Sequence, residues 1–325
     1  MSDALLARAF ADESMRAAAA VALATVAEEP TNIEPITRGN RKKTAIARFP
    51  NRGPVVVQLA AEPAWLRTEA VLLRAIRERT FVPVPPVLAA GTHADVGYVL
   101  TAYVAGSDLH ERFPVVEQAT QQELARWFGA ALGRLHEAFV FDAYGRLVVD
   151  NGGFTATQQE YQPWFASYGT DAISRLPPAF DDLTDDLRAA VASLSADRGA
   201  AHPTPRLFPW DFRPGNALVA DGSVTAVLDW EAPLSAPAAL SVAKAEYLVA
   251  DWYVDDPEPL RTAFRAGYGS VRELPSVEPA HRVAAIAASA VDAAGRVTNP
   301  RYPPVDRDAA VAFHRDALES VLPTG

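Results

Sequence analysis

Three oxygen-bearing side chains within residues 207–231 have types and spacing that suit a chemical role: Asp211, Asn216 and Asp229. A carboxylate can accept the proton of a reacting hydroxyl when it lies within hydrogen-bond reach. Amide and carboxylate oxygens are also the hard ligands that suit Mg²⁺. The set therefore fits chemistry in which a metal ion and a hydroxyl group are held close together.

The elements predicted around these residues form a hairpin. The turn pair Pro214-Gly215 precedes two short apolar strands, predicted at Ala217–Ala220 and Val224–Leu228. The turn signal Asp221-Gly222 joins the strands, and the second strand ends directly before Asp229. Such a hairpin delivers an acid, an amide and a second acid to one end of a sheet.

The same stretch resembles the catalytic motif of aminoglycoside phosphotransferases and of related choline kinase-like small-molecule kinases. That motif commonly reads His-Gly-Asp-x-x-x-x-Asn, followed by Ile-Asp-Trp-Glu. The spacing from Asp211 to Asn216 fits it, and Val-Leu-Asp-Trp-Glu at 227–231 is close to its metal-binding end. The chain departs from the pattern at Pro209-Trp210, where the family usually has His-Gly.

The resemblance implies an α+β fold of the two-lobed, protein-kinase-like type. Its small N-terminal lobe would hold an antiparallel sheet, and its C-terminal lobe would be mainly helical. We expect residues 1–103 to form a nucleotide-binding lobe with a leading helix, and residues 104–325 to form the catalytic and substrate-binding lobe.

The resemblance also implies roles for the residues of the hairpin. Asp211 would act as the base that accepts the hydroxyl proton, and Asn216 and Asp229 would bind Mg²⁺ across the phosphates of the nucleotide. Arg213 would contact phosphate or substrate, and a purely structural salt bridge stays open as the alternative. Each of these residues also has a simpler interpretation as a turn or cap residue, but their joint spacing favours the chemical one.

A second feature is a carboxylate on the helix predicted from Pro63 to about Arg79. Glu69 falls within an apolar stripe of this helix, where a lone charge costs several kcal/mol, on the order of the burial penalty, unless it is paired. In the family, a glutamate in this place pairs with a cation on the preceding strand that touches the nucleotide. The matching strand position here is Gln58, which can hydrogen-bond Glu69 but cannot neutralise phosphate.

Two interpretations of this departure stay open. A nearby cation can supply the missing charge, and the candidates are Arg38, Arg41, Lys42, Lys43 and Arg48. Alternatively, Glu69 is a partly exposed surface residue and needs no partner.

The run from Tyr98 to Gly106 resembles the hinge between the lobes of such kinases. In that case Thr101 and Tyr103 lie at the nucleotide, and backbone groups near Thr101–Val104 hydrogen-bond the edge of the base. Because a hinge reads the base with its backbone, the side chains of this run do not test the interpretation.

The remaining pattern predicts helices and short strands with no internal repeat. His136, in a helix predicted over 121–139, is expected to be a packing histidine rather than a base. Residues 140–180 are expected to be aromatic-rich and irregular. The segment 235–243 lacks the structural aspartate that the family has there, which is a third departure. Further strands are predicted at 33–36, 44–49, 55–59, 86–90 and 97–103, and further helices at 4–28, 181–196, 236–251, 258–267, 279–295 and 305–321.

Composition narrows the functional classes. The chain has 325 residues, of which 49% are hydrophobic and 22% charged, as in an ordinary globular protein. It has no cysteine, which excludes disulfides and cysteine nucleophiles and agrees with a cytoplasmic location. The net charge of −10 argues against nucleic acid and anionic membranes as partners. The apolar run at residues 17–27 is too short to span a bilayer. We expect the protein to be a monomer or a homodimer.

These observations lead to one expected function and one alternative. We expect a phosphotransferase that uses Mg²⁺ and ATP (or GTP) to phosphorylate a hydroxyl of a small molecule, with antibiotic resistance as a biological role. The acceptor would be a cationic or aromatic compound such as an aminoglycoside, a nucleoside or another antibiotic, a sugar or an amino alcohol. The alternative is a weakly active or inactive nucleotide-binding pseudokinase with a regulatory role, which the three departures favour.

Overall fold

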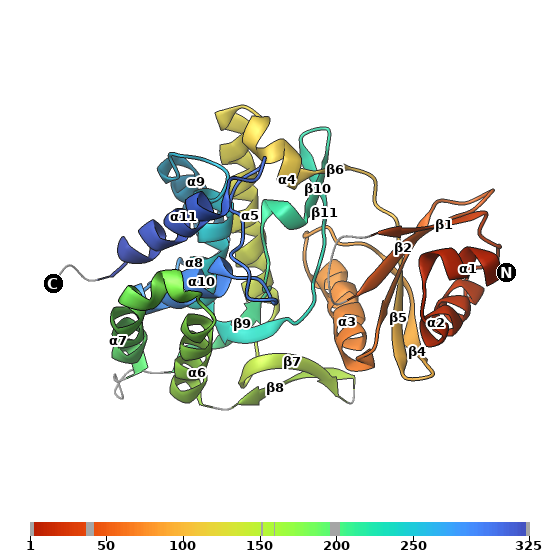
Figure 1. Cartoon of the computed structure of the whole chain (residues 1–325), viewed down its shortest axis with the longest axis horizontal. Helices are drawn as coiled ribbons and strands as arrows, with labels where there is room; N and C mark the ends of the chain where they lie inside the picture. The colour runs from red at the N-terminus through yellow and green to blue at the C-terminus, as the bar shows by residue number, and fades with distance from the viewer. Residues whose placement is uncertain (1–2, 37–41, 151, 159, 196–201, 323–325) are drawn as a thin grey trace. The chain divides into compact units, whose positions relative to one another are not determined.

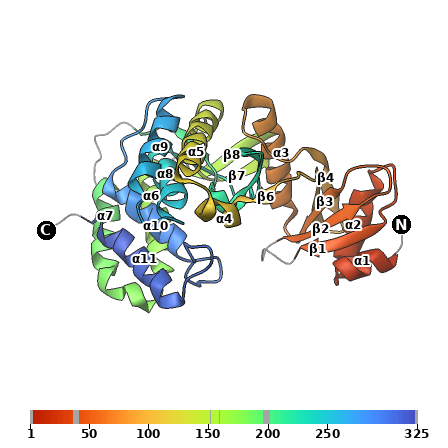
Figure 2. The ribbon, with the colours of Figure 1, turned by 90° about the horizontal axis from the view of Figure 1, so that it is seen from above.

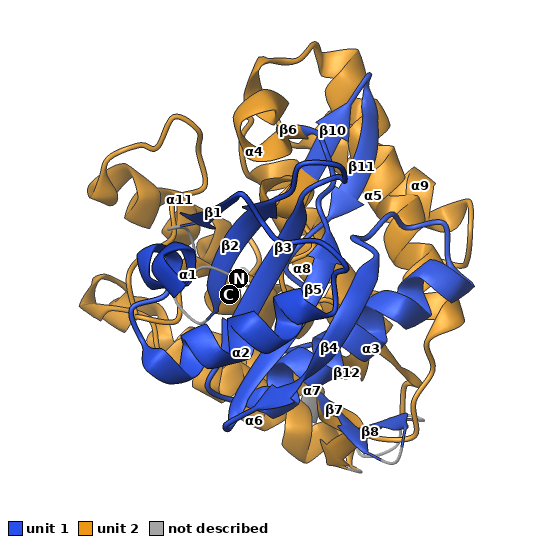
Figure 3. Cartoon of the chain, turned by 90° about the vertical axis from the view of Figure 1, so that its right-hand side faces the viewer, with its two compact units in different colours: residues 1–106, 147–155, 218–233 blue, residues 107–146, 156–217, 234–325 orange. Residues whose placement is uncertain are grey.

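The computed structural model describes residues 3–36, 42–150, 152–158, 160–195 and 202–322. The chain divides into two compact units, coloured separately in Figure 3. Unit 1 comprises residues 1–106, 147–155 and 218–233, and unit 2 comprises residues 107–146, 156–217 and 234–325. The domains expected from the sequence, 1–103 and 104–325, stay a prediction beside this division.

Unit 1 is built on an antiparallel sheet of five strands in the order β1-β2-β3-β5-β4. Successive side chains of a strand point to opposite faces of the sheet. Burial in β3 follows this rule, because Val55 and Val57 are fully buried, whereas Val56 and Gln58, which alternate with them, are partly exposed. The strands are β1 (Asn32–Ile36), β2 (Lys43–Arg48), β3 (Val55–Ala60), β4 (Val87–His93) and β5 (Val96–Ala102).

Helices cover both faces of this sheet, as Figures 1 and 2 show. α1 (Asp3–Ala9) and α2 (Glu13–Ala24) pack against one face, and α3 (Pro63–Arg79) packs against the other. The single helix predicted over 4–28 is wrong. The chain breaks after α1 because Asp12 is extended and caps α2, its carboxylate accepting from the Met15 amide at 2.9 Å.

In unit 2, α5 (Gln118–Ala138) and α9 (Glu258–Gly269) lie side by side (Figures 1 and 2). Glycines allow the close approach, because a Cβ on Gly129 would lie 1.9 Å from the carbonyl oxygen of Phe264. The other helices of the unit are α4 (Leu109–Arg112), α6 (Tyr161–Ser174), α7 (Thr184–Ser195), α8 (Ala238–Glu246), α10 (Pro279–Ala290) and α11 (Arg307–Glu319), with a π-helical turn at Tyr247–Asp251.

Short strands complete the two units. β9 (Pro205–Phe208) pairs with β12 (Leu234–Pro237), which pairs in turn with β7 (Tyr144–Asp150), and β8 (Gly153–Gln158) lies beside β7. The hairpin predicted before Asp229 is present as β10 (Ala217–Ala220) and β11 (Ser223–Val227), whose strands are neighbours in a sheet.

Three predictions about unit 2 are wrong in their detail. Residues 140–180 are not irregular, because β7, β8 and α6 lie within them. The helix predicted over 236–251 begins only after Pro237, since proline keeps the residue before it extended and Ala236 pairs in β12. The helix predicted over 279–295 ends at Ala290, and Val291 forms a bridge with Val297. None of the helices in the described residues is long and apolar enough to cross a membrane.

Candidate functional site

Unit 1 contains a cavity of about 250 Å³ against the face of the sheet that α1 and α2 leave open. Sheet pairing forms its wall. Thr44 is paired with Gln58 across β2 and β3, and the next outward-facing row joins Ile46, Val56 and Thr101. All five residues line the cavity. The residues that line the cavity therefore lie on one face of the sheet. Ala45, Val55 and Val57 lie on the opposite face, where they are buried under α1 and α2.

The end of β5 and the segment after it form an edge of this cavity, with Thr101, Tyr103 and Val104 among the lining residues. Thr101 is buried, whereas Tyr103 is exposed. The amide of Ala102 donates to the Pro86 carbonyl at 2.9 Å, and the amide of Tyr103 donates to the Pro54 carbonyl at 3.1 Å. Within the described residues the Val104 amide has no such partner. Val104 therefore offers a backbone donor at the cavity edge.

A single lysine joins three carboxylates at the same cavity. Lys42, directly before β2, places its Nζ 3.1 and 3.0 Å from the two carboxylate oxygens of Glu69. The same nitrogen lies 3.0 Å from Asp229 Oδ1 and 3.6 Å from Glu231 Oε2. Glu69 and Asp229 both line the cavity, so the lysine lies between its helix side and its hairpin side.

The carboxylates around Lys42 stabilise its charged form. Burial alone lowers the pKa of Lys42, but the neighbouring carboxylates of Glu69, Asp229 and Glu231 outweigh burial and raise the pKa above its usual range. The Glu69 side chain is 3% exposed, so the interpretation of Glu69 as a surface residue is wrong. Its partner is a cation from the loop before β2.

The other cations considered for this place are elsewhere. Lys43 and Arg48 are exposed, and Arg48 pairs with Glu34 at 3.8 Å. Arg38 and Arg41 lie outside the described residues. Gln58 lines the cavity, as its sequence position predicts, but it carries no charge.

Asp229 is presented to this cluster by an unusual backbone conformation. Its φ is +58°, in the left-handed region that a non-glycine residue seldom adopts and that Asp and Asn tolerate best. The next residue, Trp230, is buried and donates from Nε1 to the Val227 carbonyl at 2.9 Å, which fixes the end of the hairpin. Such conformations cluster at functional sites, where the surrounding structure holds them in place.

Unit 2 holds the loop that carries Asp211. The side-chain amide of Asn216 donates to the Asp211 carbonyl at 2.9 Å, so the two predicted residues fix one another. Arg213 Nε lies 3.6 Å from Asp211 Oδ2, and its guanidinium stacks over the Trp252 ring at 5.1 Å. The Asp211 side chain is 35% exposed. The loop is therefore ordered by its own contacts, and its acid stays open to solvent.

Trp210, which stands where the family usually has glycine, rests on a buried lysine of α8. Lys244 Nζ lies 3.7 Å from the centre of the Trp210 ring, and Tyr168 and Phe208 contact the same ring from other sides. Burial lowers the pKa of Lys244 to about 8, although the Asp211 carboxylate opposes this shift. Sequence reasoning missed Lys244, and the available signal was the one basic residue of a helix that is mostly apolar.

Other polar and aromatic residues considered from the sequence belong to the core of unit 2. His136 is fully buried between Tyr268 and Ser241, and burial lowers its pKa to about 3, so it is a neutral packing residue. Asp251 pairs with Arg261. The aromatic residues of 161–168 and 247–256 that are buried are Tyr161, Trp164, Phe165, Tyr247, Trp252 and Tyr253.

The donor set suits magnesium better than a softer metal. Asp229 and Asn216 supply hard oxygen atoms, and the Asp229 carboxylate is 41% exposed. Within the described residues, no three His, Cys, Asp or Glu side chains gather as a group able to hold a metal ion.

Comparison with known proteins identifies the family and the fold of the chain. A family model described as "Phosphotransferase enzyme family" matches residues 32–280. No curated protein sequence matches the chain significantly. Among solved structures, a thermostable mutant of aminoglycoside phosphotransferase APH(4)-Ia, in ternary complex with AMP-PNP and hygromycin B, has a TM-score of 0.64 and 12% identity, over 90% of this chain and 94% of that one.

Two further structures show the same likeness. A proposed fructosamine-3-kinase from Thermobifida fusca YX-ER1 has a TM-score of 0.58 and 17% identity, over 93% of this chain and 98% of that one. A proposed aminoglycoside phosphotransferase from Ralstonia eutropha JMP134 has a TM-score of 0.60 and 15% identity, over 95% of each chain. The likeness confirms the predicted α+β, kinase-like fold.

Proposed function

The chain belongs to the phosphotransferase enzyme family, and on that premise we propose that it transfers the γ-phosphate of a nucleoside triphosphate to a hydroxyl of a small molecule. The observation that carries the proposal is the Lys42 cluster at the cavity of unit 1. Phosphoryl transfer needs positioned cations and hard oxygen ligands more than covalent chemistry. A charged lysine beside a carboxylate that can bind metal supplies both.

In this proposal, Lys42 takes the phosphate-neutralising role that the sequence pattern places at Gln58. Glu69 orients the lysine, because its two oxygens contact Nζ at 3.1 and 3.0 Å. A loop lysine held at a fixed point can therefore replace a strand lysine. Gln58 then acts as a neutral wall residue that can hydrogen-bond the nucleotide.

The base of the nucleotide is proposed to lie along Thr101–Val104. The Val104 amide donor complements N1 of adenine, which is an acceptor, whereas N1 of guanine carries a hydrogen. The apolar residues Ile46, Val56 and Leu73 of the cavity suit the faces of a purine ring. We therefore propose a purine nucleoside triphosphate, ATP or GTP, as the donor, since O6 of guanine can also accept from this amide.

Asp211 is proposed to accept the proton of the acceptor hydroxyl, and its exposed carboxylate is available for that contact. Asn216 and Asp229 would hold Mg²⁺, which, when bound, neutralises charge on the phosphates. Arg213 lies against Asp211, so we propose that it orients this carboxylate and contacts a phosphate or acceptor oxygen. These roles are proposals from the motif and the local geometry.

The acceptor is proposed to be a small polyhydroxylated compound. The similar structures include a complex with hygromycin B and proteins described as fructosamine-3-kinases, so aminoglycosides, amino sugars and ketoamines are the first candidates. The rival function is a nucleotide-binding pseudokinase, which the replacement of His-Gly by Pro209-Trp210 still favours. The absence of a strand cation no longer supports it, because Lys42 supplies the charge.

The test is a turnover screen of the intact protein. ADP release from Mg-ATP is measured with a panel of aminoglycosides, ketoamines, sugars, nucleosides and amino alcohols, with EDTA as the control. The proposal predicts ADP release that depends on one acceptor class and stops with EDTA, together with a product heavier by one phosphate. If no acceptor supports turnover while Mg-ATP still raises the melting temperature, the pseudokinase function replaces the proposed one.

A further inference from the structure

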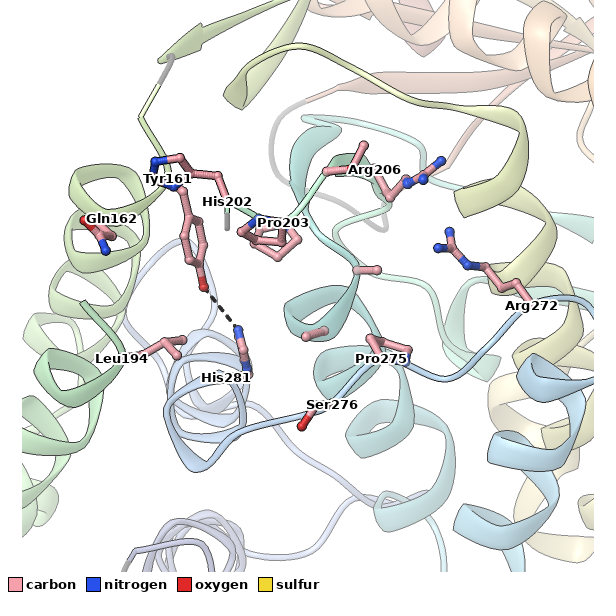
Figure 4. A pocket seen from close by; sticks show the side chains of 14 residues that line it. Tyr161, Gln162, Leu194, His202, Pro203, Arg206, Arg272, Pro275, Ser276 and His281 are labelled. Carbon is pink, nitrogen blue, oxygen red and sulfur yellow. Dashed lines mark hydrogen bonds between the residues drawn. The ribbon is translucent and has the colours of Figure 1, made fainter. Parts of the chain in front are cut away.

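Unit 2 contains a second cavity, of about 490 Å³, that the proposed phosphoryl transfer does not use. Figure 4 shows it from close by, between α6, the start of β9 and the segment that joins α9 to α10. Its volume is within the range of cavities that hold small ligands. The site residues Asp211, Arg213 and Asn216 are not among the residues that line it.

One side of the cavity carries two arginines, Arg206 of β9 and Arg272 after α9 (Figure 4). Burial, and to a smaller extent the nearby positive charge of Arg272, lower the pKa of Arg206. The described residues that line the cavity include no Asp or Glu. Two cations are therefore held together without a lining acid, in a chain whose net charge is −10.

The hydrogen bonds of these arginines are incomplete. Arg206 donates from one nitrogen to the His136 carbonyl at 3.0 Å. Nε and Nη1 of Arg272 are buried, and within the described residues they have no hydrogen-bond partner. Arg272 instead lies over the Tyr268 ring at 6.0 Å. Buried donors in folded proteins are nearly always paired, so an unpaired guanidinium at a cavity indicates a missing acceptor.

The other side of the cavity is neutral and offers a hydrogen-bond donor. Burial lowers the pKa of His281 to about 4, and its Nδ1 accepts from the Glu278 amide at 3.1 Å, so Nε2 carries the proton. His281 Nε2 lies 3.3 Å from the Tyr161 hydroxyl (Figure 4) and donates to it. The hydroxyl proton of Tyr161 is then free for an acceptor in the cavity.

We propose that this cavity binds a small organic anion, with its carboxylate or phosphate group held by Arg206 and Arg272 and its body lying toward Tyr161. A guanidinium fork matches the paired oxygens of either group. Apolar side chains, including Leu194, Pro203 and Pro275, form further parts of the wall and suit a ring or hydrocarbon body. The negative charge of the ligand offsets the like charges of the two arginines, whose guanidinium groups lack a lining acid as partner.

The position of the cavity connects it to the catalytic loop through one strand. Arg206 stands in β9, and Asp211 follows the other end of that strand. The cavity therefore borders the strand that leads into the loop, although its lining residues include none of that loop.

Binding is measured by calorimetry on the full chain with phenyl phosphate, benzoate and benzyl alcohol as probes. The proposal predicts that at least one of the two anions binds, and that benzyl alcohol, which has the ring without the charge, binds far more weakly. Arg272→Gln and Arg206→Gln should each weaken the anion about 10- to 100-fold, as expected for loss of a hydrogen bond to a charged group. Whether phosphate or carboxylate is preferred identifies the anion.

Three further variants separate loss of binding from an effect on folding or on another site. Ala238→Trp fills the cavity while both arginines remain, and should abolish binding. Arg188→Gln, at an exposed pair with Asp185, is the matched control and should bind the anion as wild type does. Lys42→Met, at the cavity of unit 1, should also leave binding unchanged, which keeps the result separate from the proposed nucleotide site. The proposal is overturned if neither anion binds, if benzyl alcohol binds equally well, or if Ala238→Trp still binds.

Discussion

At the scale of single residues, the cation that pairs with Glu69 is Lys42, which precedes β2. It does not come from β3, where Gln58 stands. Lys42 contacts Glu69, Asp229 and Glu231, and Gln58 lines the same cavity without charge. The sequence predicted that Glu69 needs a partner, because its helical face is otherwise apolar. It could not choose among five cations, since the path of a loop side chain depends on contacts distant in the sequence.

Lys42→Met should lower kcat/KM for phosphoryl transfer by about 10²- to 10³-fold, the usual effect of removing one preorganised charge partner at a transition state. Lys43→Met, the exposed neighbour, is the matched control and should leave kinetics unchanged. Adding Gln58→Lys to Lys42→Met should restore part of the rate, because it returns a cation to the strand position. Steady-state kinetics with equal rates for Lys42→Met and wild type would contradict the role.

The same substitution should also affect stability. Breaking a buried ion pair by removing one partner typically costs about 3–5 kcal/mol, because the other charge stays buried without compensation. Urea unfolding should show such a loss for Lys42→Met and a smaller loss for Lys42→Met combined with Glu69→Gln. An equal loss in the single and the double variant would show that Glu69 does not depend on the lysine.

Lys244 predicts a pH dependence of stability. Because burial lowers its pKa to about 8 from an ordinary value of 10.5, the cost of burying its charge is present below pH 8. Between pH 8 and 10.5 the folded state loses the proton before the unfolded state does, so folding becomes more favourable. The unfolding free energy of wild type should therefore rise by about 3 kcal/mol relative to Lys244→Met over this interval. If the difference in unfolding free energy between wild type and Lys244→Met did not change with pH, a lowered pKa of Lys244 would be contradicted.

At the scale of elements, local signals predicted some boundaries well and others poorly. The helix from Pro63 to Arg79 has proline at its start and arginines in its last turn, and the structure has those bounds. The strand at 234–237 was missed because its pairing with β9 is a long-range contact, and because Ala236 and the alanines after Pro237 favour a helix locally. The hairpin before Asp229 was predicted because its turn signal is local.

The α5–α9 contact gives an element-scale prediction. Gly129→Ala would place a Cβ 1.9 Å from the Phe264 carbonyl oxygen, so the two helices must move apart. We expect a loss of about 1–3 kcal/mol in unfolding free energy, as for other overpacked positions. Gly269→Ala, where a Cβ meets nothing within 4 Å, is the control for the helix propensity of alanine. Equal stability of the two variants in urea titrations would contradict the close packing.

At the scale of the whole molecule, the fold class was predictable because one motif and the order of elements around it indicated a single architecture. The site was predictable only in part. Gln58, Glu69, Thr101, Tyr103 and Asp229 line one cavity in unit 1, and Asp211, Arg213 and Asn216 share one loop in unit 2. The sequence did not single out Lys42 and did not identify Lys244. Lys42 contacts Glu69 and Asp229, and Lys244 contacts Trp210, and all these partners are distant in the sequence, so no local pattern indicates them.

Asp211 is the proposed base of an active phosphotransferase. With an acceptor from the turnover screen, the most direct measurement is kcat of Asp211→Asn, with Asp221→Asn in the exposed hairpin turn as the matched control. We predict a fall in kcat of about 10²- to 10⁴-fold, the range typical of general base catalysis. Asp221→Asn should behave as wild type does, and Mg-ATP should still raise the melting temperature of both variants. Turnover by Asp211→Asn close to that of wild type would contradict the claim.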